Sequence, residues 1–130
     1  MTARCDAIGL VVADMAEAVA FYRRLGLDFP EDADEHTEAE LAGGIRLMLD
    51  TEESIRSFTP GWTPPSGSPR VALAFQCDSP DEVDRLFRDL VQAGYRAERE
   101  PWDAFWGQRY ASVLDPDGNA ADLYARLPVD

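Results

Sequence analysis

The sequence repeats one pattern of strand and helix signals twice along its 130 residues. In each copy an apolar run typical of a strand precedes a helix-capping residue, and apolar residues at helical spacing then continue to a glycine. The first copy opens with residues 7–12 and its helix follows Asp14, whereas the second opens with residues 70–76 and its helix follows Ser79. Three strand-like runs follow each helix. This repeat restricts the fold to two related modules that each pack a helix against a sheet.

The order of elements predicts an α+β fold of two βαβββ modules, whose curved mixed sheets enclose a cleft. The strands expected after the two helices are 27–30, 37–41 and 45–50 in the first copy, and 95–98, 110–114 and 120–125 in the second. Gly43-Gly44 and Asp117-Gly118 are expected at the hairpin turns, because both pairs are typical turn residues.

The chain is expected to form a single domain, 1–130, in which the two modules flank a linker. Module one spans 1–58, the linker spans 59–69, and module two spans 70–130. The linker is rich in proline, glycine and serine, which stiffen or bend a chain and seldom form regular structure.

Composition limits the classes of function. A net charge of −13 argues against nucleic-acid binding, which draws on basic patches, although an acidic surface also attracts cationic ligands or simply maintains solubility. Two cysteines are too few for a disulfide framework. The sequence has no leader-like segment and no apolar run of membrane-spanning length, so we expect a cytoplasmic protein that does not enter the membrane.

Strand alternation indicates which side chains face the cleft. In strand 45–50 these are Arg46, Met48 and Asp50, and in the last strand they include Asp122 and Tyr124. A shift of one residue would place Arg46 and Asp50 in the helix-packed core, where unpaired charges are costly.

Aromatic and acidic residues in and before these strands predict a ligand-binding site. A planar ligand stacks favourably on indole rings, and carboxylates accept hydrogen bonds from its amines. The predicted ligand-binding residues are Trp106, Trp102, Asp50, His36, Glu38, Met48, Arg46, Tyr110, Asp122 and Tyr124. Arg46 is expected to pair with one of the acids. Two alternatives stay open: Trp102 as a seal at the end of the core, and His36 as a polar residue at a strand edge.

Two segments carry a family resemblance. Residues 12–27 look like the first helix, and its exit, of the vicinal oxygen chelate superfamily. Residues 106–110, followed by 115–119, look like its terminal hairpin. This superfamily includes glyoxalase I, extradiol dioxygenases, and fosfomycin and bleomycin resistance proteins. Within it the chain is most similar to the mitomycin-binding resistance proteins. That likeness rests on residues 14–16, 36–39, 43–47, 50–51 and 106–111.

The resemblance bears on metal binding. Metal-dependent members carry a His or Glu on the first strand of each module and a Glu on the last strand of a module. The matching first-strand positions here are Ala7 and Ala72, and only Asp122 stands where a carboxylate ligand is expected. We therefore expect no metal, no other cofactor and no catalytic residue, although an all-carboxylate site stays conceivable.

The sequence thus predicts metal-independent binding and sequestration of a planar, amine-bearing small molecule, which can be cationic. An antibiotic held in a drug-resistance protein fits best. The resemblance also implies a homodimer, with modules paired within one chain or exchanged between chains. The alternative is a lyase, isomerase or dioxygenase of the glyoxalase superfamily acting on a small molecule, with Asp122 or Glu38 as a base. A third possibility is a protein that keeps only the fold and uses an unrelated partner surface.

Overall fold

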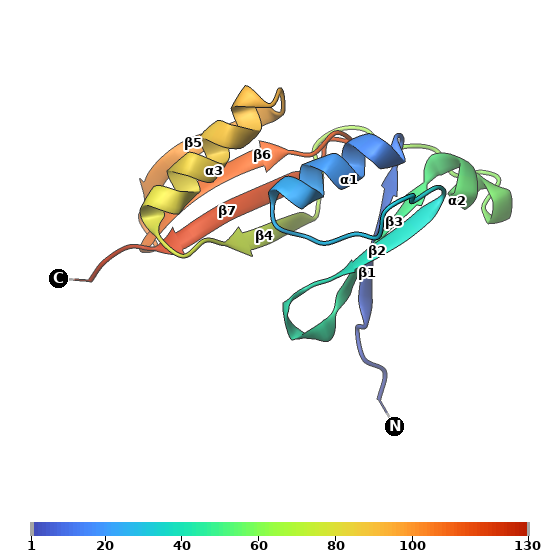
Figure 1. Cartoon of the computed structure of the whole chain (residues 1–130), viewed down its shortest axis with the longest axis horizontal. Helices are drawn as coiled ribbons and strands as arrows, with labels where there is room; N and C mark the ends of the chain where they lie inside the picture. Colours follow the sequence, from blue (N-terminus) through green and yellow to red (C-terminus); the bar gives the residue numbers. More distant parts are fainter. Residues whose placement is uncertain (1, 130) are drawn as a thin grey trace. The chain divides into compact units, whose positions relative to one another are not determined.

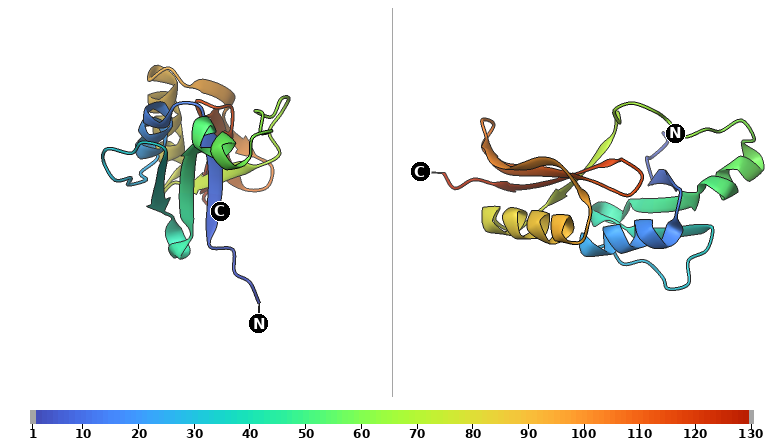
Figure 2. Two further views of the ribbon diagram at one scale, coloured as in Figure 1. Left: turned by 90° about the vertical axis from the view of Figure 1, so that its right-hand side faces the viewer. Right: turned by 90° about the horizontal axis from the view of Figure 1, so that it is seen from above.

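The computed structural model describes residues 2–129. The chain divides into two compact units, Met1–Pro65 and Ser66–Asp130, and the boundary falls inside the segment 59–69. Each unit contains a mixed sheet with a helix packed on one of its faces (Figures 1 and 2). The predicted α+β fold of two modules is confirmed.

The first unit contains a three-stranded sheet in the order β1-β3-β2. Its elements are β1 (Ala7–Val12), α1 (Met15–Arg24), β2 (His36–Glu40), a short 3-10 turn (Ala42–Gly44), β3 (Arg46–Thr51) and α2 (Glu52–Phe58). Strand β1 runs parallel to β3, and β2 runs antiparallel to it. Asp14 caps α1 as predicted, since its side chain accepts a hydrogen bond of 3.0 Å from the backbone N–H of Glu17. Phe21, Leu47 and Leu49 are fully buried in the core of this unit.

The strand predicted at 27–30 is wrong, because these residues form an irregular loop. Phe29 is buried, but its carbonyl oxygen accepts a hydrogen bond from Arg23 at 3.0 Å. Pro30 has no N–H for a sheet ladder, and Asp32 turns the chain with a φ of 63°. The first module therefore contains one strand fewer than expected.

The sequence also failed to indicate helix α2. Its cap is Thr51, whose hydroxyl oxygen accepts a hydrogen bond of 3.1 Å from the backbone N–H of Ser54. Glu52 and Glu53 occupy the first turn, where acidic side chains favour a helix. These signals were present, but they lie directly after a strand and the helix spans only seven residues.

The second unit contains a four-stranded sheet in the order β4-β7-β6-β5. Its elements are β4 (Ala72–Gln76), α3 (Pro80–Gln92), β5 (Arg96–Ala104), β6 (Gln108–Leu114) and β7 (Ala120–Arg126). Ser79 caps α3 and Pro80 occupies its first turn, as predicted. Val83 and Leu90 of α3 are buried with Leu123 of β7, so the helix covers one face of the sheet (Figure 1).

Strand β5 is much longer than the predicted 95–98. It continues through Pro101 and Trp102 to Ala104, with irregular register between Ala97 and Arg99 and between Arg99 and Trp102. A proline is tolerated here because β5 is an edge strand of the sheet. Among the described residues, no helix is long and apolar enough to cross a membrane.

Candidate functional site

The second unit presents a row of aromatic side chains on the sheet face opposite α3, which we call the open face. Residues paired across adjacent strands project to the same face of a sheet. Trp102 pairs with Tyr110, and Tyr110 pairs with Tyr124. Three of the predicted ligand-binding residues thus form one row across β5, β6 and β7, which we call the aromatic row.

Trp106 extends this row at the turn between β5 and β6. Its ring meets Trp102 at 5.5 Å and Tyr110 at 5.4 Å between centroids, both edge to face. Its indole N–H donates to the side-chain oxygen of Gln108 at 2.8 Å. The ring is therefore held in place on one side, while 47% of the residue's surface stays open to solvent. An ordered but exposed indole is a suitable platform for a planar ligand.

Asp122 lies beside the aromatic row on β7. The Tyr110 hydroxyl donates a hydrogen bond to its carboxylate oxygen Oδ2. Burial of the ring, together with this hydrogen bond, raises the pKa of Tyr110 to about 12. Tyr110 is accordingly a protonated donor at neutral pH, and it fixes the orientation of the Asp122 carboxylate.

Trp102 has a polar atom without a partner. Its indole N–H is buried, and among the described residues nothing accepts a hydrogen bond from it. The guanidinium carbon of Arg99 lies 5.4 Å from the centroid of the same ring, within the range of a cation–π contact. The sequence did not point to Arg99, because the strand predicted at 95–98 ended before it.

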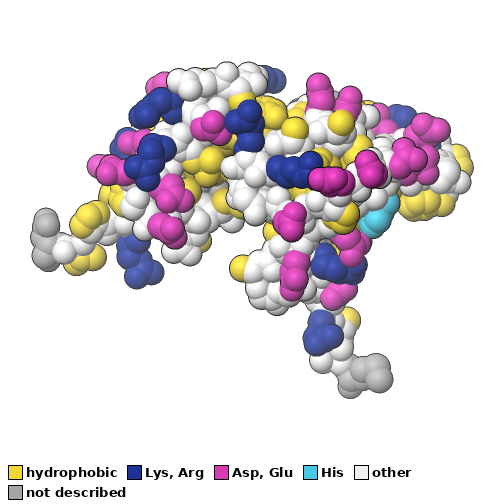
Figure 3. All heavy atoms as spheres, in the orientation of Figure 1, with side chains coloured by type: hydrophobic (Ala, Val, Ile, Leu, Met, Phe, Trp, Pro, Cys, Tyr) yellow, Lys and Arg dark blue, Asp and Glu magenta, His cyan; other side chains and the backbone are white. Residues whose placement is uncertain are grey.

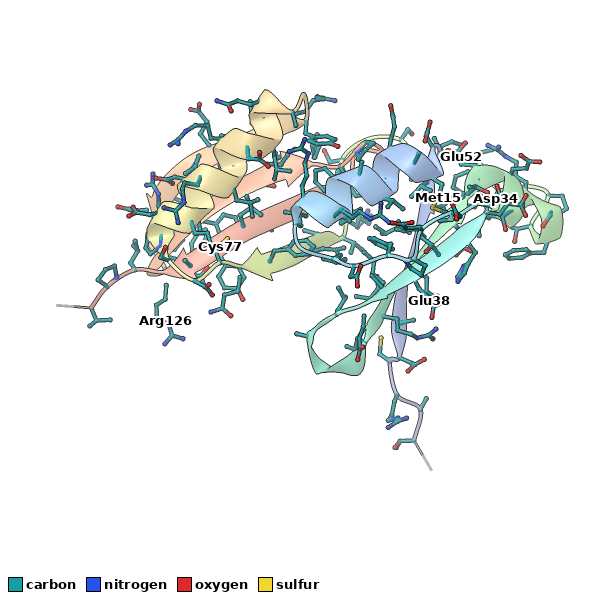
Figure 4. The ribbon with its side chains drawn as sticks, viewed as in Figure 1. Met15, Asp34, Glu38, Glu52, Cys77 and Arg126 are labelled. Carbon is teal, nitrogen blue, oxygen red and sulfur yellow. The ribbon has the colours of Figure 1, made fainter. Side chains whose placement is uncertain are left out.

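The first unit has its own open face, opposite α1, and it carries the remaining predicted residues. His36 pairs with Asp50 and Glu38 pairs with Met48 across β2 and β3, while Arg46 lies two residues before Met48. Figure 4 shows Glu38 on β2. The alternation predicted for strand 45–50 agrees with the structure, because Leu47 and Leu49 are buried and the residues between them are not.

Charged side chains on this face form a continuous network. His36 Nδ1 lies 2.6 Å from Asp50 Oδ1, and His36 Nε2 lies 3.0 Å from Glu38 Oε2. Arg46 donates to Glu38 at 2.8 Å, as the sequence predicted, and to Asp6 at 2.7 Å. Positive and negative groups thus alternate from Asp50 to Asp6. Elsewhere acidic side chains and arginines are interspersed over the surface (Figure 3).

The contacts of His36 favour its protonated form. Both ring nitrogens face carboxylate oxygens, and only the doubly protonated imidazolium donates at both. Hydrogen bonds to Asp50 and then to Glu38 raise the pKa of His36 above its ordinary value of 6.5. Hydrogen bonds from Arg46 and His36 lower the pKa of Glu38. His36 and Arg46 therefore compensate the charges of Asp50 and Glu38, which makes these acids weaker anchors for a ligand amine than the sequence suggested.

The structure thus separates the predicted site residues into two groups. His36, Glu38, Arg46, Met48 and Asp50 lie on the first unit, and Trp102, Trp106, Tyr110, Asp122 and Tyr124 lie on the second. Each group is assembled by strand pairing within its own unit. That both groups line one cleft stays a prediction.

Comparison with known proteins decides the family. The sequence model of the Glyoxalase/Bleomycin resistance protein/Dioxygenase superfamily matches residues 4–123. The chain belongs to this superfamily. No match was found among curated proteins.

Solved structures of other superfamily members share the fold. An enzyme of this superfamily from Burkholderia phytofirmans superposes with a TM-score of 0.83 at 20% identity, over 96% of this chain and 100% of the other. A glyoxalase-related enzyme from Fulvimarina pelagi superposes with a TM-score of 0.81 at 22% identity, over 95% of this chain and 88% of the other. A member from Nocardioides superposes with a TM-score of 0.75 at 25% identity, over 100% of this chain and 87% of the other. None of these comparisons singles out a likeness to mitomycin-binding proteins.

The residues of this chain do not fit the metal chemistry implied by the resemblance. Ala7 and Ala72 carry no donor atom, and Tyr110 already occupies one oxygen of Asp122. Both nitrogens of His36 are committed to carboxylates. Within residues 2–129 no group of three or more His, Cys, Asp or Glu side chains is arranged to hold a metal ion.

Proposed function

We propose that the protein binds and sequesters a planar, amine-bearing small molecule without a metal. The ligand stacks on the exposed face of Trp106, beside the aromatic row of the second unit, and its ammonium group approaches Asp122. We further propose that the natural ligand is an antibiotic and that capture protects the cell from it.

One observation carries this proposal: Trp102, Tyr110 and Gln108 fix the exposed ring of Trp106, and Tyr110 also orients the carboxylate of Asp122. A ring that is already ordered loses little conformational entropy when a ligand stacks on it. Stacking contributes about 0.5–1.5 kcal/mol beyond area burial. The carboxylate adds a charge-assisted hydrogen bond to an ammonium group.

Two further facts support capture of a cationic drug. The net charge of −13 produces a negative potential that attracts cations. The superfamily's name includes bleomycin resistance proteins, which makes drug resistance a function present in this fold. A fold hosts many functions, so the site geometry rather than the family carries the argument.

The test is a titration of chelator-treated protein with naphthylmethylamine and with its neutral methylnaphthalene counterpart, followed by calorimetry. We expect saturable binding of the amine and weaker binding of the neutral compound. Trp106→Ala should weaken amine binding about two- to tenfold, as expected for one lost stacking partner. Trp62→Ala is the matched control, since Trp62 belongs to the first unit and lies under Arg56 at 5.3 Å.

Mass spectrometry of the ligand after incubation separates capture from catalysis. Recovery of unchanged amine in the amount added supports sequestration. Conversion of the ligand to a product would overturn it in favour of the enzymatic alternative. Unchanged affinity of Trp106→Ala would remove this ring from the site.

A further inference from the structure

A second row of side chains lies next to the aromatic row on the open face of the second unit. Arg99 on β5 pairs with Ser112 on β6, and Ser112 pairs with Asp122 on β7. Arg99, Ser112 and Asp122 therefore project from the same face in one line, which we call the polar row. A cation and a carboxylate occupy its two ends.

A β-bulge explains how Arg99 reaches this face. Three positions separate Arg99 from Trp102, so a regular strand would direct the two side chains to opposite faces. Their pairing partners on β6, Ser112 and Tyr110, are only two positions apart. Strand β5 therefore contains one extra residue between Arg99 and Trp102. Bulges redirect a side chain in this way. The contact of 5.4 Å between the Arg99 guanidinium and the Trp102 ring shows the outcome.

Arg99 and Asp122 do not satisfy each other. Two strand spacings separate them, which is about 10 Å between backbones. Ser112, which pairs with both, has a short side chain that cannot bridge the two charges. Among residues 2–129 neither Arg99 nor Asp122 takes part in an ion pair. Two opposite charges thus lie beside the aromatic row. The exposed Arg99 and the carboxylate oxygen of Asp122 that Tyr110 does not occupy can meet groups of a ligand.

We propose that the ligand of this face is a planar zwitterion: its ring lies along the aromatic row, its ammonium group meets Asp122, and an anionic group meets Arg99. This inference rests on the proposed function and narrows its ligand class from amines to molecules with both charges. A carboxylate or a phosphate matches the planar guanidinium, which forms two parallel hydrogen bonds with such groups. Arg99 is then a specificity-determining residue.

Three probes with the same ring system test this proposal by calorimetry: naphthylmethylamine, naphthoic acid, and an aminomethyl-naphthoic acid with its two groups at opposite ends of the ring. We expect the zwitterion to bind about two- to fivefold more tightly than the amine, the upper part of the range for one exposed ion pair. Arg99→Gln should abolish that advantage, so that the zwitterion no longer binds more tightly than the amine. Arg85→Gln on the outer surface of α3 is the matched control and should preserve the advantage.

The outcomes separate the two proposals. If the amine binds as well as the zwitterion, and Arg99→Gln alters neither, the zwitterion inference is overturned and capture of amines stands. If none of the three probes binds, both proposals fail. Arg99 is exposed, so its replacement should not prevent folding, and an unchanged circular dichroism spectrum of Arg99→Gln checks this.

Discussion

The stability of the turn between β5 and β6 should depend on Trp106 and hardly at all on its neighbour Phe105. Both are large aromatic residues, but Trp106 is 47% exposed and Phe105 is 90% exposed. Trp106 contacts three aromatic rings and donates a hydrogen bond to Gln108. Replacing each in turn by alanine therefore compares a partly packed ring with a solvated one.

The expected magnitudes follow from the hidden area. A fully buried large aromatic residue removes about 150–250 Å² from water, so Trp106 hides roughly 100 Å² and Phe105 roughly 20 Å². At about 25 cal/mol per Å², these areas correspond to about 2.5 and 0.5 kcal/mol, as upper values. The lost hydrogen bond to Gln108 adds about 0.5–1 kcal/mol for Trp106. We expect Trp106→Ala to lower the free energy of unfolding by about 2–3 kcal/mol, and Phe105→Ala by about 0.5 kcal/mol or less.

Urea unfolding followed by circular dichroism at 222 nm measures both values, and an unchanged slope with urea shows that the same structure unfolds. Trp106→Phe should lower the free energy of unfolding by about 1 kcal/mol, between the losses for Phe105→Ala and Trp106→Ala, because a ring remains but the hydrogen bond to Gln108 is lost. Equal losses for Trp106→Ala and Phe105→Ala would refute the reasoning, because Trp106 would then not be held by the aromatic row.

The other predictions concern charge, turn structure and assembly. The resonance of the single histidine should titrate with a pKa above 6.5. The stabilisation from His36 is then complete below pH 6.5 and is lost as the pH rises through this raised pKa. A measured pKa at or below 6.5 would contradict the charge network on the first unit. Asp115→Ala should lower the free energy of unfolding by about 2–3 kcal/mol, because the buried carboxylate accepts from the N–H groups of Asp117 and Asn119; a loss below about 1 kcal/mol in urea unfolding would contradict this. Ultraviolet titration should show one phenol group with a pKa of about 12, and this transition should be absent from Tyr110→Phe. If the transition persists in the variant, it belongs to another tyrosine and the prediction fails. Light scattering should give twice the chain mass of 14.4 kDa, and a single-chain mass would refute the predicted homodimer.

Local signals in the sequence sufficed for helices α1 and α3 and for several strands. Asp14 and Ser79 cap their helices through side-chain contacts that span three residues, so no distant partner is needed to predict them. The position of Arg46 and Asp50 on the sheet face opposite α1 also followed from strand alternation alone, because a shifted register would bury both charges.

Features that depend on partners distant in sequence were missed. Residues 27–30 alternate apolar and other side chains like a strand, but they pair with no strand among the described residues. The alternation of a segment does not show whether a partner strand lies beside it. Arg99 reaches the open face only through a bulge, which is fixed by pairing with β6. The contact of His36 with Asp50 likewise depends on the register of β2 against β3. The aromatic residues of the candidate site could therefore be proposed from the sequence, but the placement of Arg99 and the pairing of His36 with Asp50 could not.

The most direct test of ligand capture on the second unit uses the three tryptophans as separate reporters. Their indole N–H resonances are assigned with single Trp→Phe variants, and the protein is titrated with naphthylmethylamine. The account predicts that the Trp102 and Trp106 resonances shift together to saturation while that of Trp62 stays in place. Saturable binding that shifts Trp62 and leaves Trp102 and Trp106 unmoved would contradict it.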